Sequence, residues 1–141
     1  MNPICAVGGV VYRLNDRHQL EVLLIRKRGS TWSLPKGKLK TDEPHDAALS
    51  REIHEETGVI GVPEEFVGEA VYTIKKQGPR TKIVTYYLVR AVGGNLRPDR
   101  HEKIKDVVWV SLPRALRRVR RPRLQAILRA AQSILVVPVL P

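Results

Sequence analysis

Short apolar runs alternate with polar stretches along the chain, and the first two runs are typical of buried strands. Residues 4–12 read ICAVGGVVY and residues 21–26 read EVLLIR, and both are rich in β-branched side chains. Gly8 and Gly9 in the first run indicate either a bulge or the close approach of another part of the chain. We expect a turn between the two strands at residues 15–18.

Two longer patterns predict a β-hairpin. Residues 66–76 and residues 81–90 read as strands, and Gln77-Gly78-Pro79 between them is a turn signal. Consecutive side chains of a strand point to opposite faces of a sheet, so Tyr86 and Tyr87 must lie on different faces. One tyrosine can then pack in the core and the other can stack on a nucleobase, although burial is the commoner fate of tyrosine.

Two helices are predicted, one central and one near the C-terminus. Thr41 or Asp42 can cap the central helix by accepting a backbone N–H, and Gly58 fits the left-handed residue that often ends a helix. The second helical pattern covers residues 112–133, where apolar residues recur at roughly helical spacing. Pro122 should break or kink this second helix.

Positive charge is concentrated near the C-terminus. The net charge is +11, from 25 basic and 14 acidic residues. A polar loop at residues 93–102 and a short strand at residues 107–110 come first, and beyond Asp106 the sequence holds seven arginines and no acidic residue. Such a balance suits anionic ligands or nucleic acid, so RNA is a candidate partner, whereas a solvated basic helix face is the simplest interpretation.

Length and composition predict one globular domain over residues 1–141. Hydrophobic residues make up 43% of the chain and charged residues 28%, which is typical of folded domains. The single cysteine, Cys5, fits a reducing cytoplasm. No apolar run approaches the roughly 20 residues that span a bilayer, and the apolar stretch at residues 134–141 is short and contains prolines. We therefore expect no membrane association and no signal peptide.

Residues 37–59, GKLKTDEPHDAALSREIHEETGV, carry the strongest chemical pattern. Glu52, Glu55 and Glu56 are spaced i, i+3 and i+4, which puts three carboxylates on one helix face. Like charges at this spacing repel by roughly 0.2–0.5 kcal/mol per pair. Three glutamates alone would indicate a solvated acidic face, and it is the match of the whole pattern that favours a bound cation. Oxygen ligands indicate Mg²⁺ or Mn²⁺. Arg51 can orient a carboxylate through two hydrogen bonds, and Gly37 lets the backbone approach an ion or a phosphate.

The same stretch resembles the signature of the Nudix hydrolases. That signature is Gly, five residues, Glu, seven residues, Arg-Glu, an aliphatic residue, any residue, Glu-Glu, any residue, Gly and an aliphatic residue. Every fixed position is present, namely Gly37, Glu43, Arg51, Glu52, Ile53, Glu55, Glu56, Gly58 and Val59. The resemblance implies an α/β fold, an α/β/α sandwich with a mixed central sheet. It also implies hydrolysis of a nucleoside diphosphate linked to another moiety.

The resemblance assigns roles to these residues. Metal binding falls to Glu52, Glu55 and Glu56, with a backbone carbonyl from the Gly37 region. Arg51 and Glu43 would support the geometry of the loop and helix. In the family a further acidic residue from a late loop often joins the metals or acts as a base; Glu102 is our candidate here, and Asp99 is the second choice.

The lead-in to the signature bears on the substrate. Trp-x-x-Pro-Lys-Gly at residues 32–37 is similar to Nudix members acting on dinucleoside polyphosphates and to some nucleotide-sanitising members. Dinucleoside polyphosphates such as diadenosine tetraphosphate are therefore the first expectation and oxidised nucleoside triphosphates the second. The 5′ end of RNA is the third, because of the C-terminal arginines. A basic nucleotide- or nucleic-acid-binding Nudix module without catalysis is a different class, but such modules are expected to lose the metal-binding glutamates.

Candidate site residues follow from these patterns. The candidate catalytic residues are Glu52, Glu55, Glu56, Arg51 and Glu102. The candidate substrate-binding residues are basic or aromatic side chains from the lead-in, the adjoining strands and the hairpin: Lys36, Arg26, Arg28, Tyr86, Tyr87 and Lys82.

Overall fold

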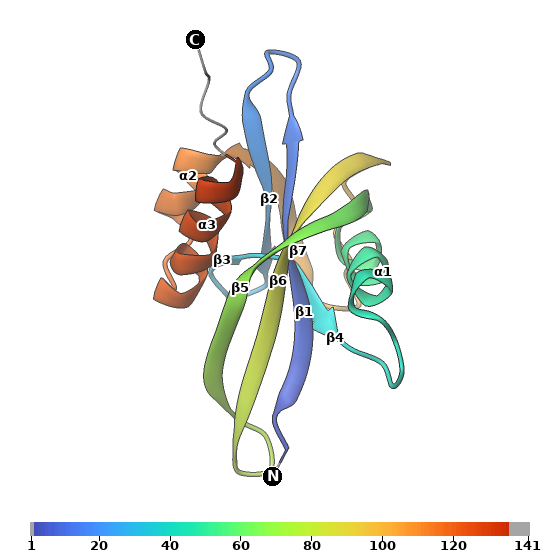
Figure 1. Cartoon of the computed structure of the whole chain (residues 1–141), viewed down its shortest axis with the longest axis vertical. Helices are drawn as coiled ribbons and strands as arrows, with labels where there is room; N and C mark the ends of the chain where they lie inside the picture. Colours follow the sequence, from blue (N-terminus) through green and yellow to red (C-terminus); the bar gives the residue numbers. More distant parts are fainter. Residues whose placement is uncertain (1, 136–141) are drawn as a thin grey trace.

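The chain folds into one mixed sheet with helices on both faces (Figure 1). The computed structural model describes residues 2–135, so the predictions about the C-terminal apolar stretch lie mostly outside the described residues. The strands are β1 (Ile4–Leu14), β2 (Leu20–Lys27), β3 (Trp32–Ser33), β4 (Lys36–Lys38), β5 (Val59–Lys75), β6 (Pro79–Gly94) and β7 (Ile104–Ser111). The helices are α1 (His45–Thr57), α2 (Leu112–Arg118) and α3 (Pro122–Leu135). The predicted α/β/α sandwich with a mixed sheet is confirmed.

The sheet combines one parallel pairing with several antiparallel ones. Its main order is β3-β2-β1-β6-β5, with β4 paired to β1 and β7 paired to β2. β1 runs parallel to β6, whereas the other pairings are antiparallel. The hairpin of β5 and β6 confirms the prediction, but both strands are longer than expected. The sequence hid the extension because irregular pairing near Pro63 and Gly68 interrupts the alternating pattern of β5.

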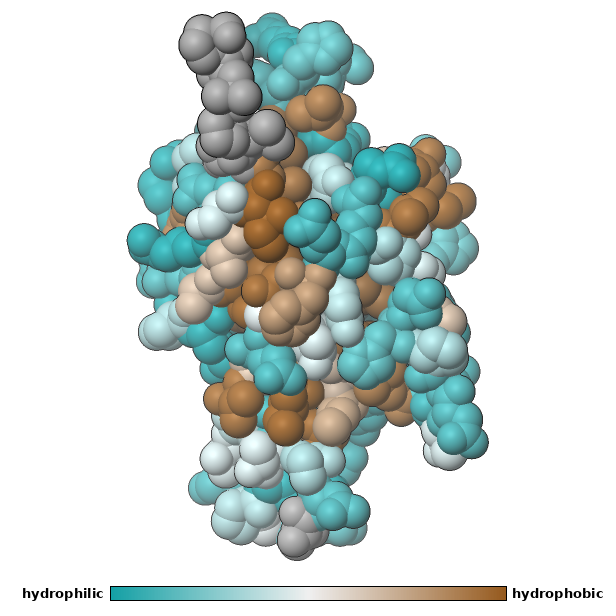
Figure 2. Space-filling model, viewed as in Figure 1, coloured by the Kyte–Doolittle hydropathy of each residue, from teal (hydrophilic) through white to brown (hydrophobic). Residues whose placement is uncertain are grey.

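Each face of the sheet packs against its own helical layer. Val10 and Tyr86 belong to the core that α3 covers, together with Leu124 and Leu128. The second core lies on the other face and contains Val7, Val11, Leu49, Ile53 and Val89. Alternation along β1 and β6 produces this division, because successive side chains point to opposite faces. In Figure 2 the apolar side chains that reach the surface form separate patches among hydrophilic ones.

Gly8 is required by a close approach rather than by a bulge. A Cβ at Gly8 would lie 2.3 Å from Cε1 of Tyr86. The pairing of β1 with β6 continues without interruption through Gly8 and Gly9, opposite Tyr86 and Tyr87. Of the two expectations for this glycine pair, the close approach is therefore confirmed.

The start of α1 differs from the prediction, whereas its end agrees. Pro44 is the N-cap, and no side chain caps the helix. Thr41 and Asp42 lie too early to act as caps, because Asp42 takes a positive φ of 60° in the turn before the helix. Gly58 ends the helix as expected, with a φ of 81° and its N–H donating to the carbonyl of His54.

The C-terminal helical pattern is split where Pro122 predicts. α2 ends at Arg118, and Pro122 is the first residue of α3, where its missing N–H costs nothing. Ser111 caps α2 by accepting from the N–H of Arg114 at 3.3 Å. Within residues 2–135, no helix has both the length and the apolar character needed to cross a bilayer.

Candidate functional site

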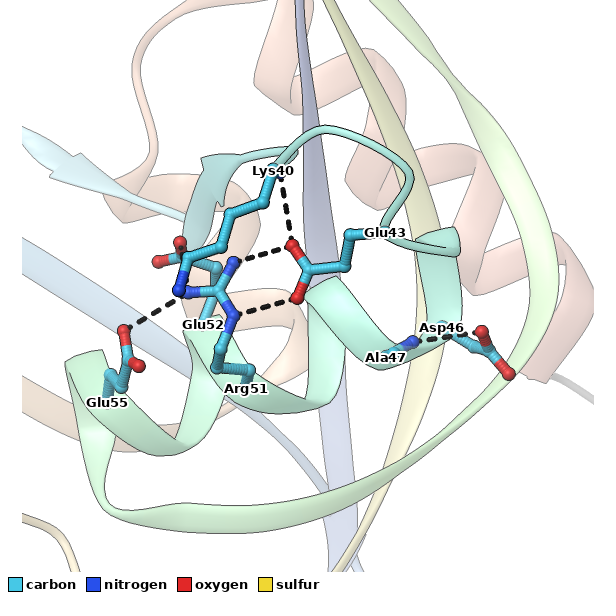
Figure 3. Close-up of polar contacts among 7 residues, drawn as sticks. All are labelled: Lys40, Glu43, Asp46, Ala47, Arg51, Glu52 and Glu55. Carbon is cyan, nitrogen blue, oxygen red and sulfur yellow. Dashed lines mark hydrogen bonds and ion pairs between the residues drawn. The ribbon is translucent and has the colours of Figure 1, made fainter.

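Arg51 organises the acidic residues of the loop and helix (Figure 3). Its guanidinium donates two hydrogen bonds to Glu43, with Nη2–Oε1 at 2.8 Å and Nε–Oε2 at 2.9 Å. Nη1 donates to Glu52 at 2.9 Å and to Glu55 at 3.4 Å. The hydrogen bonds from Arg51 hold the pKa of Glu43 at about 2. The expected two-pronged contact thus exists, and the carboxylate it orients is that of Glu43.

The carboxylate of Glu52 occupies the space that a side chain at Gly37 would fill. A Cβ at Gly37 would lie 2.0 Å from Cδ of Glu52. Only 17% of the Glu52 side chain is exposed. Burial raises its pKa, while Arg51 acts in the opposite direction. Gly37 is therefore needed where the sequence places it, because β4 and α1 meet at this point.

Glu56 is the most buried carboxylate of the signature. Its residue is 4% exposed, and Oε1 accepts a hydrogen bond from the backbone N–H of Lys36 at 3.0 Å. Burial raises the pKa of Glu56 to about 8, with a further contribution from the neighbouring charge of Glu52. A buried carboxylate facing a second one is unfavourable without a cation.

The three glutamates offer only oxygen ligands, which fits a hard divalent ion. Among residues 2–135, however, no three His, Cys, Asp or Glu side chains already converge on one point. The reason is that Arg51 draws Glu52 and Glu55 toward itself. Because Glu55 is 53% exposed and its contact with Arg51 is long, it is free to turn toward an ion. The residues therefore fit a divalent metal.

A cavity of about 180 Å³ adjoins Glu56, and we call it the Glu56 cavity. Its lining residues are Ile25, Lys27, Ser30, Thr31, Ser33, Leu34, Lys36, Glu56 and Arg121. One buried carboxylate and three cations thus face a single small space. Such a cavity matches a phosphate chain that is bound partly through a metal and partly through basic side chains.

Two basic side chains contact Tyr72, one at its hydroxyl and the other at its ring. Nζ of Lys36 donates to the Tyr72 hydroxyl at 2.8 Å, and the guanidinium of Arg123 lies 3.8 Å from the ring centroid. Burial lowers the pKa of Lys36 to about 8, and Arg123, Arg121 and Lys27 contribute in the same direction. The positive charges are therefore crowded enough to favour an anionic ligand.

The profile of the NUDIX domain family matches residues 5–131. The chain belongs to the Nudix hydrolase family. The signature at residues 37–59 lies within the region that matches the family. Its glutamates Glu52, Glu55 and Glu56 all lie on α1, as the sequence predicts.

Relatives by sequence include enzymes with different stated substrates. An 8-oxo-(d)GTP phosphatase from Mycolicibacterium smegmatis is 35% identical over 133 residues, which cover 88% of this chain and 40% of that protein. An ADP-ribose pyrophosphatase from Methanocaldococcus jannaschii is 28% identical over 102 residues, covering 69% of this chain and 56% of that protein. This chain thus spans about half the length of these curated relatives or less.

Solved Nudix structures share the fold. The NUDIX domain of Shewanella oneidensis NrtR, complexed with ADP ribose, superposes with a TM-score of 0.78 at 19% identity, over 96% of this chain and 90% of that one. A binary complex of the C. elegans Ap4A hydrolase has a TM-score of 0.74 at 22% identity, over 94% and 97% of the two chains. At these identities the likeness concerns the fold alone.

Lys36 and Lys82 are the predicted substrate-binding residues that lie near the Nudix site. Lys36 lines the Glu56 cavity. Burial lowers the pKa of Lys82, and Lys36 contributes to this shift, so the two ammonium groups lie within electrostatic range of each other. Glu102 lies in the loop that the N–H of Asp99 ties to the carbonyl of Glu56 at 3.1 Å, and its charge is the smallest of the causes that raise the pKa of Glu52 and Glu56.

Of the two tyrosines, Tyr86 is the one that packs in the core. Tyr86 is 1% exposed and packs beneath the site in the core under α3, so no base can stack on its ring. Tyr87 lies on the opposite face, as the alternation requires, and its hydroxyl contacts Nδ1 of His45 at 2.8 Å. Tyr87 is not among the residues that line the Glu56 cavity.

Arg26 and Arg28 do not reach the Glu56 cavity either. Arg26 donates two hydrogen bonds to Asp106, at 2.9 and 2.5 Å, and lies 4.8 Å from the centroid of Trp32. Arg28 follows the end of β2 and lines a different cavity. The expected phosphate contact by these two residues therefore does not extend to the space beside Glu56.

Sequence reasoning missed the contribution of α3. Arg121 lines the Glu56 cavity and Arg123 covers Tyr72, although the C-terminal arginines were expected mostly to face solvent. The available signal was Pro122, which follows the α2 segment and lies between Arg121 and Arg123. A helix that restarts at Pro122 places its first turn beside the sheet edge.

Proposed function

We propose that this chain is a divalent-metal-dependent hydrolase of phosphoanhydride bonds in nucleoside polyphosphates. The observation that carries the proposal is the joint burial of Glu52 and Glu56 against the Lys36–Gly37 backbone, beside a cavity lined by Lys27, Lys36 and Arg121. Acidic residues for a metal and basic residues for phosphates thus share one place. Mg²⁺ is the expected ion, with Mn²⁺ as the alternative.

Each part of the site has a separate task in this reaction. When bound, a divalent ion would supply positive charge to the phosphate oxygens and would lower the pKa of a water molecule. Glu52, Glu55 and Glu56 would hold that ion, and Arg51 would keep the preceding loop against α1 through its two hydrogen bonds to Glu43. Lys36 and Arg121 would stabilise the charge that develops on the phosphates. We assign the role of proton acceptor for the attacking water to Glu102.

Two substrate classes are supported by separate observations. The relative named 8-oxo-(d)GTP phosphatase, which matches 88% of this chain, supports a nucleoside triphosphate with an oxidised base. The lead-in at residues 32–37, which folds into β3 and β4 beside Glu56, supports a dinucleoside polyphosphate such as diadenosine tetraphosphate. Both classes contain at least three consecutive phosphates, for which a cation-lined cavity is suited.

A nucleotide panel tests the proposal. The purified chain is incubated with oxidised and ordinary nucleoside triphosphates, diadenosine tetraphosphate, ADP-ribose and 5′-triphosphorylated RNA, with Mg²⁺ and then with EDTA. We expect hydrolysis that requires Mg²⁺, and the masses of the products identify the cleaved bond. The matched control is Glu56→Gln, which should lose more than about 100-fold in turnover. Binding of nucleotides without any metal-dependent cleavage would favour a non-catalytic binding module instead.

A further inference from the structure

A second cavity, lined by four basic side chains, lies near the Glu56 cavity. Its volume is about 430 Å³, and its lining residues are Arg28, Arg100, Lys103, Ile104 and Lys105. The four basic residues are exposed, and none forms an ion pair within the part of the chain that the structure describes. Cations that converge without an anionic partner repel one another, so this basic cavity favours an anion.

Backbone hydrogen bonds attach the basic cavity to the Nudix helix. The N–H of Arg28 donates to the carbonyl of Lys103 at 3.0 Å. This hydrogen bond links the segment after β2 to the loop before β7, and both line the basic cavity. The N–H of Asp99 donates to the carbonyl of Glu56 at 3.1 Å, and the N–H of Ile104 donates to the carbonyl of Asp99 at 3.0 Å. The loop that carries Arg100 and Lys103 is thus fixed directly to the backbone of Glu56.

Consecutive residues at the end of β2 line the two cavities. Lys27 lines the Glu56 cavity, and the next residue, Arg28, lines the basic cavity. Glu102 lies between Arg100 and Lys103 in the same loop, which the hydrogen bond from the N–H of Asp99 fixes to the carbonyl of Glu56. The basic cavity is therefore next to the Glu56 cavity along β2 and is tied to the backbone of Glu56 through Asp99.

We propose that the basic cavity binds the phosphate groups of the substrate that lie beyond the bond being cleaved. This inference rests on the function proposed above and narrows it, because a site for additional phosphates favours substrates with long phosphate chains. Arg28 and Arg100 present planar guanidinium groups that match phosphate oxygens, and Lys103 and Lys105 add point charges. Dinucleoside tetraphosphates should therefore gain more from this site than nucleoside triphosphates.

A binding experiment without metal tests the site itself. Inorganic tripolyphosphate is titrated calorimetrically into the parent protein, the double variant Arg28→Ala/Lys103→Ala and the control Arg114→Ala/Arg117→Ala, all in EDTA. Both variants lose two exposed positive charges, but only the first loses them from the basic cavity. We expect about tenfold weaker binding in the first variant and less than about twofold in the control. Equal weakening in both variants, or no change in either, would overturn the proposal.

A kinetic experiment tests the occupant. The ratio of kcat/KM for diadenosine tetraphosphate to kcat/KM for a nucleoside triphosphate should fall about tenfold in Arg28→Ala/Lys103→Ala and stay unchanged in the control. A loss confined to 5′-triphosphorylated RNA would overturn the assignment and identify an RNA backbone as the occupant. Absence of Mg²⁺-dependent hydrolysis on every nucleotide would overturn the proposed function instead, since the binding experiment needs neither metal nor turnover.

Discussion

At the scale of single residues, Glu56 is a carboxylate placed where little water reaches it. Its residue is 4% exposed, and burial raises its pKa to about 8. At neutral pH the metal-free protein therefore holds much of Glu56 in the protonated form. A cation would stabilise the ionised form and reverse this preference.

Replacing Glu56 with glutamine should stabilise the metal-free protein in a pH-dependent way. The unfolded chain ionises Glu56 above its ordinary pKa of 4.5, whereas the folded chain keeps the proton up to about 8. The parent therefore loses stability as the pH rises from 4.5 to 8, and Glu56→Gln does not. In EDTA the variant should be more stable by about 2–4 kcal/mol at pH 8 and equal near pH 4.5. Denaturant unfolding at the two pH values measures this, and equal stability at pH 8 would contradict it.

Arg51 depends on its geometry as well as on its charge. Arg51→Lys keeps the positive charge but loses the pair of hydrogen bonds to Glu43. We expect about tenfold lower kcat/KM and about 1 kcal/mol lower stability, because the acidic loop is no longer held against α1. The same exchange at the exposed Arg114 is the control. Steady-state kinetics with thermal unfolding decides the matter, and full activity in Arg51→Lys would remove Arg51 from the site.

At the scale of elements, the end of α1 is hydrogen-bonded to the loop that follows β6. The N–H of Arg97 donates to the carbonyl of Thr57 at 2.8 Å, next to the contact between Asp99 and Glu56. Gly58 lies at this junction with a positive φ. The proposed metal ligands on α1 and the loop that carries Glu102 are therefore joined at this glycine.

Gly58→Ala should disturb this junction. Alanine is strained at a φ of 81°, and its Cβ would lie 2.0 Å from the carbonyl oxygen of Asn95. We expect a loss of stability of about 1–3 kcal/mol together with lower activity, because the loop must move away from α1. Gly29→Ala is the control, since its φ is also positive but nothing lies within 4 Å of its Cβ. A thermal unfolding midpoint equal in both variants would contradict the packing argument.

The sequence predicted elements better than it predicted their ends. The two strands before the signature and the break at Pro122 are confirmed because each depends on local apolar pattern or on proline chemistry. The predicted N-cap of α1 was wrong because Asp42 lies in a turn before the helix. The geometry of that turn depends on the contacts of Glu43 with Lys40 and Arg51. Local propensity carries no information about those contacts.

At the scale of the whole molecule, the Glu56 cavity is formed where separate layers meet. The signature helix α1 lies on one side of the sheet and α2 and α3 lie on the other (Figure 1), while Arg121, between α2 and α3, lines the cavity together with Glu56. The sequence showed the acidic half of this site because its residues are close along the chain. The basic half could not be read in the same way, because nothing local relates Arg121 to Glu56, 65 positions earlier.

Arg121→Ala tests the contribution of the C-terminal helices. We expect KM for the nucleotide substrate to rise about tenfold while kcat changes less, since Arg121 lines the cavity but forms no ion pair with the proposed metal ligands Glu52, Glu55 and Glu56. Arg129→Ala removes an equally positive residue from an exposed position of α3 and is the control. Identical kinetics for the two variants would show that Arg121 does not contribute to substrate binding.

The parallel pairing of β1 with β6 also has a consequence for synthesis on the ribosome. Ile4 pairs with Lys82 and Tyr12 pairs with Arg90, so the first strand finds this neighbour only after more than half of the polypeptide has been made. Until then the valine-rich start of the nascent protein has an open edge and little to cover it. Cotranslational folding should therefore be late and nearly all at once, and chains arrested before residue 90 are expected to be bound by chaperones.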